Sequence, residues 1–116
     1  MNETIKTKWV AALRSSEFKQ GKNTLKMGDE YCCLGVLCEL YRREVGGAEW
    51  ELSQSCETGT VDTFLGKWDK PAEPVRTWAE MLEANPEIPA FQTSLTELND
   101  TGKTFSEIAD IIEKYL

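Results

Sequence analysis

The sequence predicts a single α+β domain over residues 1–116, in which four or five short helices pack around a buried central helix at about 31–45. A small antiparallel β element is predicted at about 48–66. Three observations support this fold class. Apolar residues recur at helical spacing in several stretches, one stretch is apolar on almost every side, and helical spacing disappears across the predicted β element. A length of 116 residues supports one hydrophobic core but not two.

The first helix is predicted over residues 3–15, with Asn2 as its N-cap. Its apolar face lies at positions i, i+4, i+7 and i+8 and consists of Ile5, Trp9, Ala12 and Leu13. The helix should end near Ser15, because the next stretch, FKQGKNTLKMGDEY, is rich in Gly, Asn and Asp, which favour turns. We interpret that stretch as a loop or a short hairpin whose second strand includes Thr24 to Met27.

The central helix is predicted in the stretch DEYCCLGVLCELY, where three of the four cysteines fall within seven positions. One helical face and the residues that widen it are Cys33, Leu34, Val36, Leu37, Cys38, Leu40 and Tyr41. So little polar surface remains that this helix should be buried, and Gly46 should end it. We expect Cys32, Cys33 and Cys38 to be free thiols that act as small packing residues, with Gly35 allowing a close approach to a neighbour.

The remaining elements follow in order along the chain. Two short strands flank a CETG turn within the β element, and a third helix is predicted over 74–84, with Pro74 in its first turn. Two capping boxes then each open a helix: Ser94 with Glu97 begins SLTELND, and Thr104 with Glu107 begins TFSEIADIIEKYL.

The net charge of −7 is distributed unevenly. Residues 1–27 contain six Lys and Arg against two Glu, which gives +4 and leaves −11 for the rest of the chain. An acidic body repels phosphates, so binding to nucleic acid is not expected, although a local basic segment can still hold a small anion. No stretch is apolar enough to span a membrane or to act as a signal peptide, so the expected location is the cytoplasm.

The residue types argue against most catalytic chemistry. The chain has no histidine and no C-x-x-C pair, which disfavours zinc binding and excludes papain-like catalysis. Acidic pairs such as Glu49 and Glu51 resemble surface charge. We therefore predict no catalytic residues, no metal and no cofactor, and a protein that is not an enzyme. An enzyme stays open as a third alternative, because Asp, Glu, Lys, Tyr and Cys can still act as acids, bases or nucleophiles.

Two loops contain candidate ligand-binding residues. In FKQGKN, Lys19, Gln20, Gly21 and Lys22 place ammonium groups and backbone amides where they can converge on a phosphate or carboxylate. The second loop, LNDTGK, offers Asn99 and Asp100, which can bind a base edge or a hydroxyl group. We add Arg14 and Tyr31 as neighbouring candidates. The alternatives are an ordinary solvent-exposed turn for the first loop and turn-forming residues for the second.

The motifs WVAALRS, CCLGVLC and LNDTGKTFSEIAD, together with the Q-G loop, resemble a family of small, largely uncharacterised phage and prophage proteins. The two matching blocks cover about half of the chain and lie towards its two ends. This resemblance implies a phage accessory protein that acts inside a bacterial cell. It further implies counter-defence, by sequestering a nucleotide-type immune signal or by blocking a defence protein.

Two functional hypotheses follow. The first is a non-enzymatic protein that binds or sequesters a small anionic, nucleotide-type signal through the loop at Lys19 to Lys22. The second is an acidic inhibitor that uses its negative surface to engage a host defence enzyme or a DNA-binding enzyme. The four Trp residues also make a homo-oligomer reasonable, because aromatic residues favour interfaces.

Overall fold

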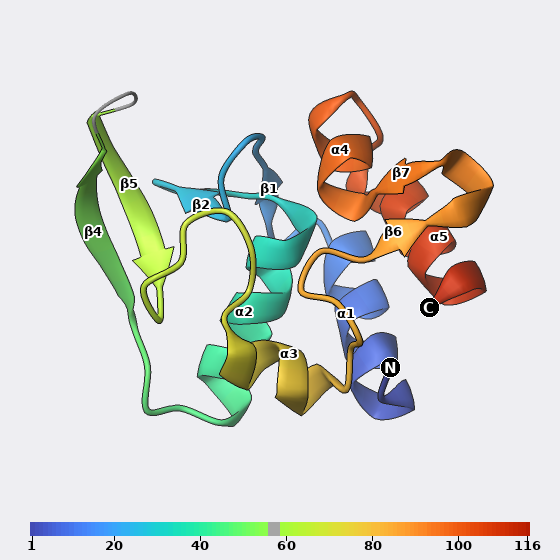
Figure 1. Ribbon diagram of the computed structural model, residues 1–116, viewed down its shortest axis with the longest axis horizontal. Helices are drawn as coiled ribbons and strands as arrows, with labels where there is room; N and C mark the ends of the chain where they lie inside the picture. The colour runs from blue at the N-terminus through green and yellow to red at the C-terminus, as the bar shows by residue number, and fades with distance from the viewer. Residues whose placement is uncertain (56–58) are drawn as a thin grey trace.

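Five α-helices, one 3₁₀ helix and three small sheets form an α+β domain in the computed structural model, which describes residues 1–55 and 59–116 (Figure 1). The helices are α1 (Glu3–Arg14), α2 (Cys33–Glu44), α3 (Glu73–Ala79), η1 (Pro89–Phe91), α4 (Leu95–Asp100) and α5 (Phe105–Tyr115). The strands are β1 (Lys19–Gln20), β2 (Lys26–Met27), β3 (Glu30–Tyr31), β4 (Trp50–Ser55), β5 (Gly59–Phe64), β6 (Glu87–Ile88) and β7 (Thr93–Ser94). The predicted fold class is confirmed.

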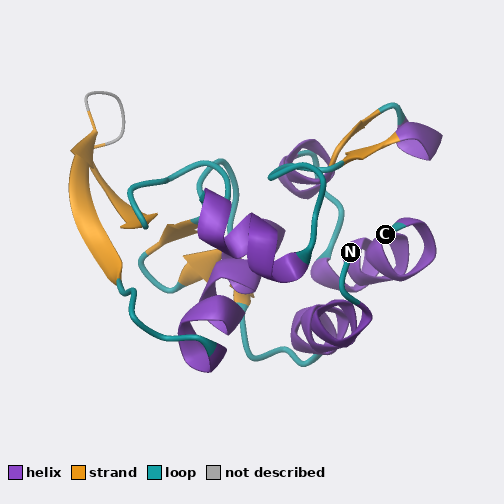
Figure 2. Ribbon diagram, turned by 60° about the horizontal axis from the view of Figure 1, so that its bottom comes forward, coloured by secondary structure: helices purple, strands orange, loops and turns teal. Residues whose placement is uncertain are grey.

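Helix α2 lies at the centre of the domain, with α1 and α5 on one side and the β4–β5 hairpin projecting from the other (Figures 1 and 2). Its first two turns are buried, and Leu34, Val36 and Leu37 have no exposed surface. The helix starts two residues later than predicted, because Tyr31 pairs in a sheet and Cys32 is the N-cap, with its sulfur accepting from Gly35 N–H at 3.4 Å. The prediction of a buried central helix is confirmed.

Gly35 lies against the backbone of Leu25. A Cβ atom added at Gly35 would be 1.8 Å from the Leu25 carbonyl oxygen, a distance that no side chain can tolerate. That oxygen also accepts a hydrogen bond from Cys32 N–H at 3.0 Å, while Leu25 N–H donates to the Trp68 carbonyl at 2.8 Å. Leu25 is thus held on both sides, and the predicted close approach at Gly35 is confirmed.

The helix caps agree well with the sequence. Asn2 accepts from Ile5 N–H at 3.0 Å, and the capping box of Thr104 and Glu107 forms in both directions. Ser94 accepts from Glu97 N–H and begins α4. Buried apolar residues from α1, α2 and α5 join one core, and the Trp9 indole N–H donates to the Cys33 carbonyl at 2.9 Å.

The sheets differ in part from the prediction. The antiparallel pair β4–β5 is confirmed, while the predicted CETG turn lies largely at 56–58, outside the described residues. The predicted hairpin strand over Thr24 to Met27 is confirmed only at Lys26–Met27, and its predicted place as the second strand is wrong. Lys26–Met27 is instead the first strand of a hairpin with β3, joined by a two-residue turn that begins at Gly28, whose φ is 64°. The Leu25 backbone is already bonded to Trp68 and Cys32, so it is not available for a strand.

Helix α3 is shorter than the predicted range of 74–84. It ends at Ala79, because Glu80 adopts a left-handed conformation with φ 56°. The chain therefore turns, so that Met81 is buried and Leu82 is 96% exposed. The two-residue strands β6 and β7 were not predicted, since strands this short show no periodicity.

A buried carboxylate ties the β4–β5 hairpin to α2. Glu39, only 4% exposed, accepts hydrogen bonds from the Arg42 and Arg43 guanidinium groups and from the Trp50 indole N–H. Burial alone would raise the pKa of Glu39, but hydrogen bonds from Arg42, Trp50 and Arg43 outweigh it and lower this pKa to about 2.

None of the helices described in the structure has the length and apolar character needed to cross a membrane.

Candidate functional site

Four of the predicted site residues meet in one hydrogen-bonded network, which we call the polar junction: Gln20, Gly21, Asn99 and Asp100. Gln20 donates to Asn99 Oδ1 at 2.9 Å and to the Lys103 carbonyl at 2.7 Å, and it accepts from Phe105 N–H. The side chain of Asn99, which has no exposed surface, donates to the Gly21 carbonyl at 2.9 Å and to Asp100. The junction therefore joins the loop after α1 to the connection between α4 and α5.

Asp100 extends the junction to Asn23. The same carboxylate oxygen accepts from Asn99 Nδ2 at 3.1 Å and from Asn23 N–H at 3.0 Å. Asn23 has a φ of 71°, a conformation that asparagine tolerates better than most residues. Asp100 thus fixes the conformation of the loop at Asn23.

The other four predicted residues do not converge with the junction on one ligand site. Arg14 pairs with Asp110 and Glu113 on α5, at 2.6 and 3.3 Å. Lys19 lies 3.6 Å from Glu30, and Tyr31 packs edge-on against Phe18 and Trp50. Lys22 is exposed and has no ion pair within the described part of the chain.

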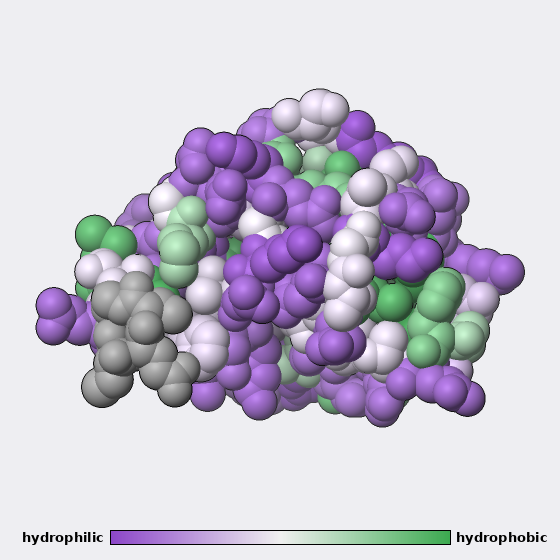
Figure 3. Space-filling model, turned by 90° about the horizontal axis from the view of Figure 1, so that it is seen from above, coloured by the Kyte–Doolittle hydropathy of each residue, from purple (hydrophilic) through white to green (hydrophobic). Residues whose placement is uncertain are grey.

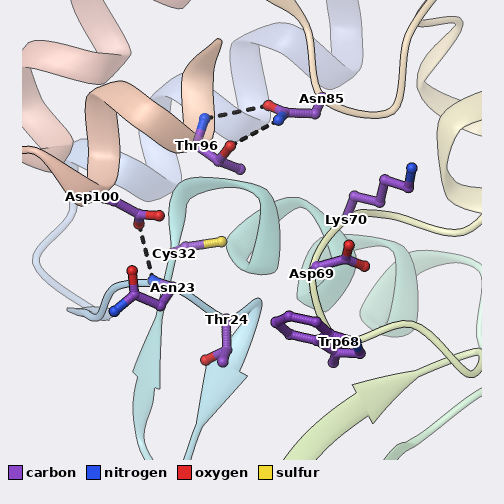
Figure 4. A pocket seen from close by; sticks show the side chains of 9 residues that line it. All are labelled: Asn23, Thr24, Cys32, Trp68, Asp69, Lys70, Asn85, Thr96 and Asp100. Atoms are coloured by element: carbon purple, nitrogen blue, oxygen red, sulfur yellow. Dashed lines mark hydrogen bonds between the residues drawn. The ribbon is translucent and has the colours of Figure 1, made fainter. Parts of the chain in front are cut away.

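A polar cavity of about 320 Å³ adjoins the junction, and we call it the Trp68 pocket (Figure 4). It is formed by the loop after β1, the start of α2, the segment after β5, and α4 with the loop before β6. The residues that line it are Asn23, Thr24, Cys32, Trp68, Asp69, Lys70, Asn85, Thr96 and Asp100. The volume is at the lower end of those typical for small-molecule sites, which begin at about 300 Å³.

The walls of the Trp68 pocket combine a flat aromatic ring with hydrogen-bonding groups. The Trp68 indole is 49% exposed, and Asp69 and Lys70 are exposed beside it. On the opposite wall the Asn85 amide is held by Thr96, through its side-chain oxygen at 2.7 Å and its N–H at 3.3 Å (Figure 4). Asp69 and Lys70 have no ion pair within residues 1–55 and 59–116, so their charges are available to a ligand.

Cys32 contributes its sulfur to the pocket floor, yet the thiol is not activated. Burial raises the pKa of Cys32 to about 11, so the thiol stays neutral near pH 7. Burial also raises the pKa of Cys33 and of Cys38. All three are buried free thiols, which confirms their packing role, while Cys56 lies outside the described residues.

The sequence predicted residues at the edge of the Trp68 pocket but not most of the residues that line it. Asp100 was predicted, and Asn23 and Thr24 lie on the predicted loop. Trp68, Asp69 and Lys70 were missed, because the segment after β5 has no periodicity and its approach to α4 depends on tertiary structure. One signal was available: an aromatic residue followed by Asp, Lys and Pro is polar enough to favour an exposed loop.

Among the described residues, no group of three or more His, Cys, Asp or Glu side chains has the arrangement needed to hold a metal ion.

The fold and the site define a small α+β domain with a polar pocket beside an internally bonded junction. All of residues 1–116 match a family described as a domain of unknown function, DUF8296, and the chain belongs to that family. Neither the curated proteins nor the solved structures contain a match to the chain.

Proposed function

We propose that this protein is a non-enzymatic binding protein that holds a small nucleotide-type molecule in the Trp68 pocket. The observation that carries the proposal is the half-exposed Trp68 ring, which faces a cavity of about 320 Å³ whose other lining residues, apart from Cys32, have polar side chains. Stacking of a base on an aromatic ring contributes about 1–3 kcal/mol. A planar ring between Trp68 and the Asn85 wall would have both a stacking surface and hydrogen-bonding partners.

The charges around the pocket support a ligand with two chemically different ends. Asp69 and Asp100 accept hydrogen bonds and suit amino groups on a base edge. Lys70 at the rim, and Lys22 on the loop that leads to Asn23, suit a phosphate. This modifies the first hypothesis from the sequence, because Lys22 stays a candidate while Lys19 already has Glu30 as a partner.

The proposal assigns binding without turnover. The thiol in the pocket is kept neutral, and the Asp100 carboxylate is bonded within the junction. The resemblance to phage and prophage proteins supports a role as a phage accessory protein in the bacterial cytoplasm, where sequestering a nucleotide-type immune signal would counter host defence.

Calorimetric titration with AMP, GMP, CMP and UMP tests the proposal, after native mass spectrometry of protein purified from bacterial cells has shown whether a small molecule is retained. Trp68→Ala should weaken binding by roughly 10-fold or more, since the stacking contribution is lost. Phe91→Ala is the matched control, because Phe91 is similarly exposed, at 40%, but does not line the pocket. Lys70→Ala has a matched control in Lys67→Ala, an exposed lysine that does not line the pocket.

Unchanged affinity in Trp68→Ala would place binding elsewhere on the molecule. A protein that retains no small molecule and binds none of the four nucleotides would show that the assignment is wrong. Chemical change of a bound nucleotide would make the protein an enzyme.

A further inference from the structure

A second cavity, remote from the Trp68 pocket in its lining residues, lies where the two ends of the chain meet the loop after α3 (Figure 1). We call it the Leu82 groove. Its volume is about 280 Å³, and the residues that line it are Met1, Met81, Leu82, Glu83, Pro86, Glu87, Tyr115 and Leu116. Leu82 is 96% exposed and Tyr115 is 41% exposed, so the groove presents apolar surface to solvent.

The backbone explains why this apolar surface is outside the core. Glu80 ends α3 in a left-handed conformation, after which Met81 fills the core and Leu82 points outward. The patch continues beyond the groove, because Phe91 packs edge-on against Tyr115 with 6.2 Å between ring centres. Figure 3 shows hydrophobic residues at the surface of the end formed by β6, η1 and β7, and others at the opposite end near β4 and β5, among mainly hydrophilic residues. A continuous exposed apolar patch of this kind often marks a contact with another protein.

The charges of the groove indicate the kind of partner. Glu83 and Glu87 line it, no Lys or Arg lines it, and neither glutamate is in an ion pair within the described ranges. Two cations lie close by: the Met1 ammonium in the lining, and Lys114, whose ammonium is 5.3 Å from the centre of the Tyr115 ring. The groove thus combines apolar residues with two glutamates.

We propose that the Leu82 groove docks a basic segment of a partner protein, which places an apolar anchor residue against Leu82 and lysine or arginine side chains against Glu83 and Glu87. A second copy of this chain is a poorer occupant, because a symmetric contact would bring the glutamates of both copies together. This inference does not depend on the proposed nucleotide site, since the two cavities share no residue.

The probe is a short synthetic peptide that carries leucine and phenylalanine on one helical face and lysine on the other, compared with a version in which glutamate replaces each lysine. Fluorescence anisotropy should show binding of the basic peptide that weakens as salt rises. Leu82→Ser should weaken this binding about tenfold, as expected for loss of an anchor contact. The double change Glu83→Lys with Glu87→Lys should weaken it at least as much and remove most of the salt dependence.

Leu52→Ser and Glu51→Lys are matched controls, because Leu52 is also strongly exposed, at 74%, and both residues lie on β4. They should bind the peptide as the wild type does. Equal binding of the acidic peptide, or unchanged binding in Leu82→Ser, would overturn the proposal. Self-association in sedimentation experiments that is lost in Leu82→Ser would also overturn it, in favour of a second copy. Because Leu82 packs against so little, its replacement should not disturb folding.

Discussion

The polar junction and the Trp68 pocket lie side by side and share Asp100, yet they use polar groups in opposite ways. In the junction, the side chains of Gln20 and Asn99 bond to each other and to backbone groups, so their donors and acceptors already have partners inside the protein. In the pocket, Asp69 and Lys70 face solvent without an ion pair in the described chain. The bonded junction holds the fold together, whereas the pocket leaves Asp69 and Lys70 available to the proposed ligand.

The two regions also differ in how they relate to the sequence motifs. The Q-G loop and the L-N-D string provide the junction, where the side chains of Gln20, Asn99 and Asp100 each have at least two partners. Loss of any of these side chains would leave a polar group of the junction without one of its partners, which is costly inside a protein. Trp68 belongs to no such string.

The largest expected effect is that of Gly35→Ala. Helix propensity favours alanine by about 1 kcal/mol, but the added Cβ would collide with the Leu25 carbonyl, which is 1.8 Å away. Because Leu25 is bonded to Cys32 and Trp68, the clash should move the pocket wall and cost at least about 3 kcal/mol of stability in urea denaturation. Gly47→Ala is the control. The φ of 78° at Gly47 makes alanine strained there, but the added Cβ would have no atom of the surrounding structure within 4 Å. Similar losses in both variants would contradict the clash.

Glu39, like the side chains of the junction, is hydrogen-bonded inside the protein, but it carries a charge. Its contribution to stability should therefore depend on pH. Its pKa falls from the usual 4.5 to about 2 in the folded protein, so its ionised form stabilises the fold. The stabilisation should be complete above about pH 4.5 and should be lost as the pH falls towards 2; the shift corresponds to roughly 3 kcal/mol. The measurement is denaturant unfolding of wild type and Glu39→Gln across this range, with the difference between them shrinking as the pH falls.

Glu49→Gln is the matched control for that experiment. It removes an exposed carboxylate that lies 3.4 Å from the same Arg42. Exposed pairs contribute little, about 0–1 kcal/mol, so its profile should follow the wild type. A difference between wild type and Glu39→Gln that stays constant with pH would mean that Glu39 acts through packing rather than charge.

The sequence predicted the elements that are determined by residues close together in the chain. Asn2, Thr104 and Glu107 cap their helices because a cap needs only neighbouring residues, and the burial of α2 followed from its composition. The end of α3 was missed because nothing local marks Glu80 as left-handed.

The sequence predicted only residues at the edge of the candidate site, because most contacts in the site depend on residues that are far apart in the chain. Gln20 and Asn99 are 79 residues apart, and their contact depends on how the whole chain folds. Asp100 was identified as a polar residue in a loop, but its two roles, in the junction and in the pocket, require the tertiary structure.

Two variants with small expected changes in stability, Asn99→Ala in the junction and Trp68→Ala in the pocket, compare the two regions most directly. Asn99→Ala removes the donor to the buried Gly21 carbonyl and one of the two acceptors for the Gln20 amide, whose bond to the Lys103 carbonyl remains. The unpaired Gly21 carbonyl should make this change cost about 2 kcal/mol. Trp68→Ala should cost about 1 kcal/mol or less, because half of the ring is already in solvent and the backbone bond to Leu25 remains. Urea unfolding of both variants, measured beside nucleotide titration, should therefore give opposite rankings: Asn99→Ala is the worse for stability and Trp68→Ala the worse for binding. If Trp68→Ala ranked worst in both, the tryptophan would be a structural residue, and the distinction between a bonded junction and an open pocket would fail.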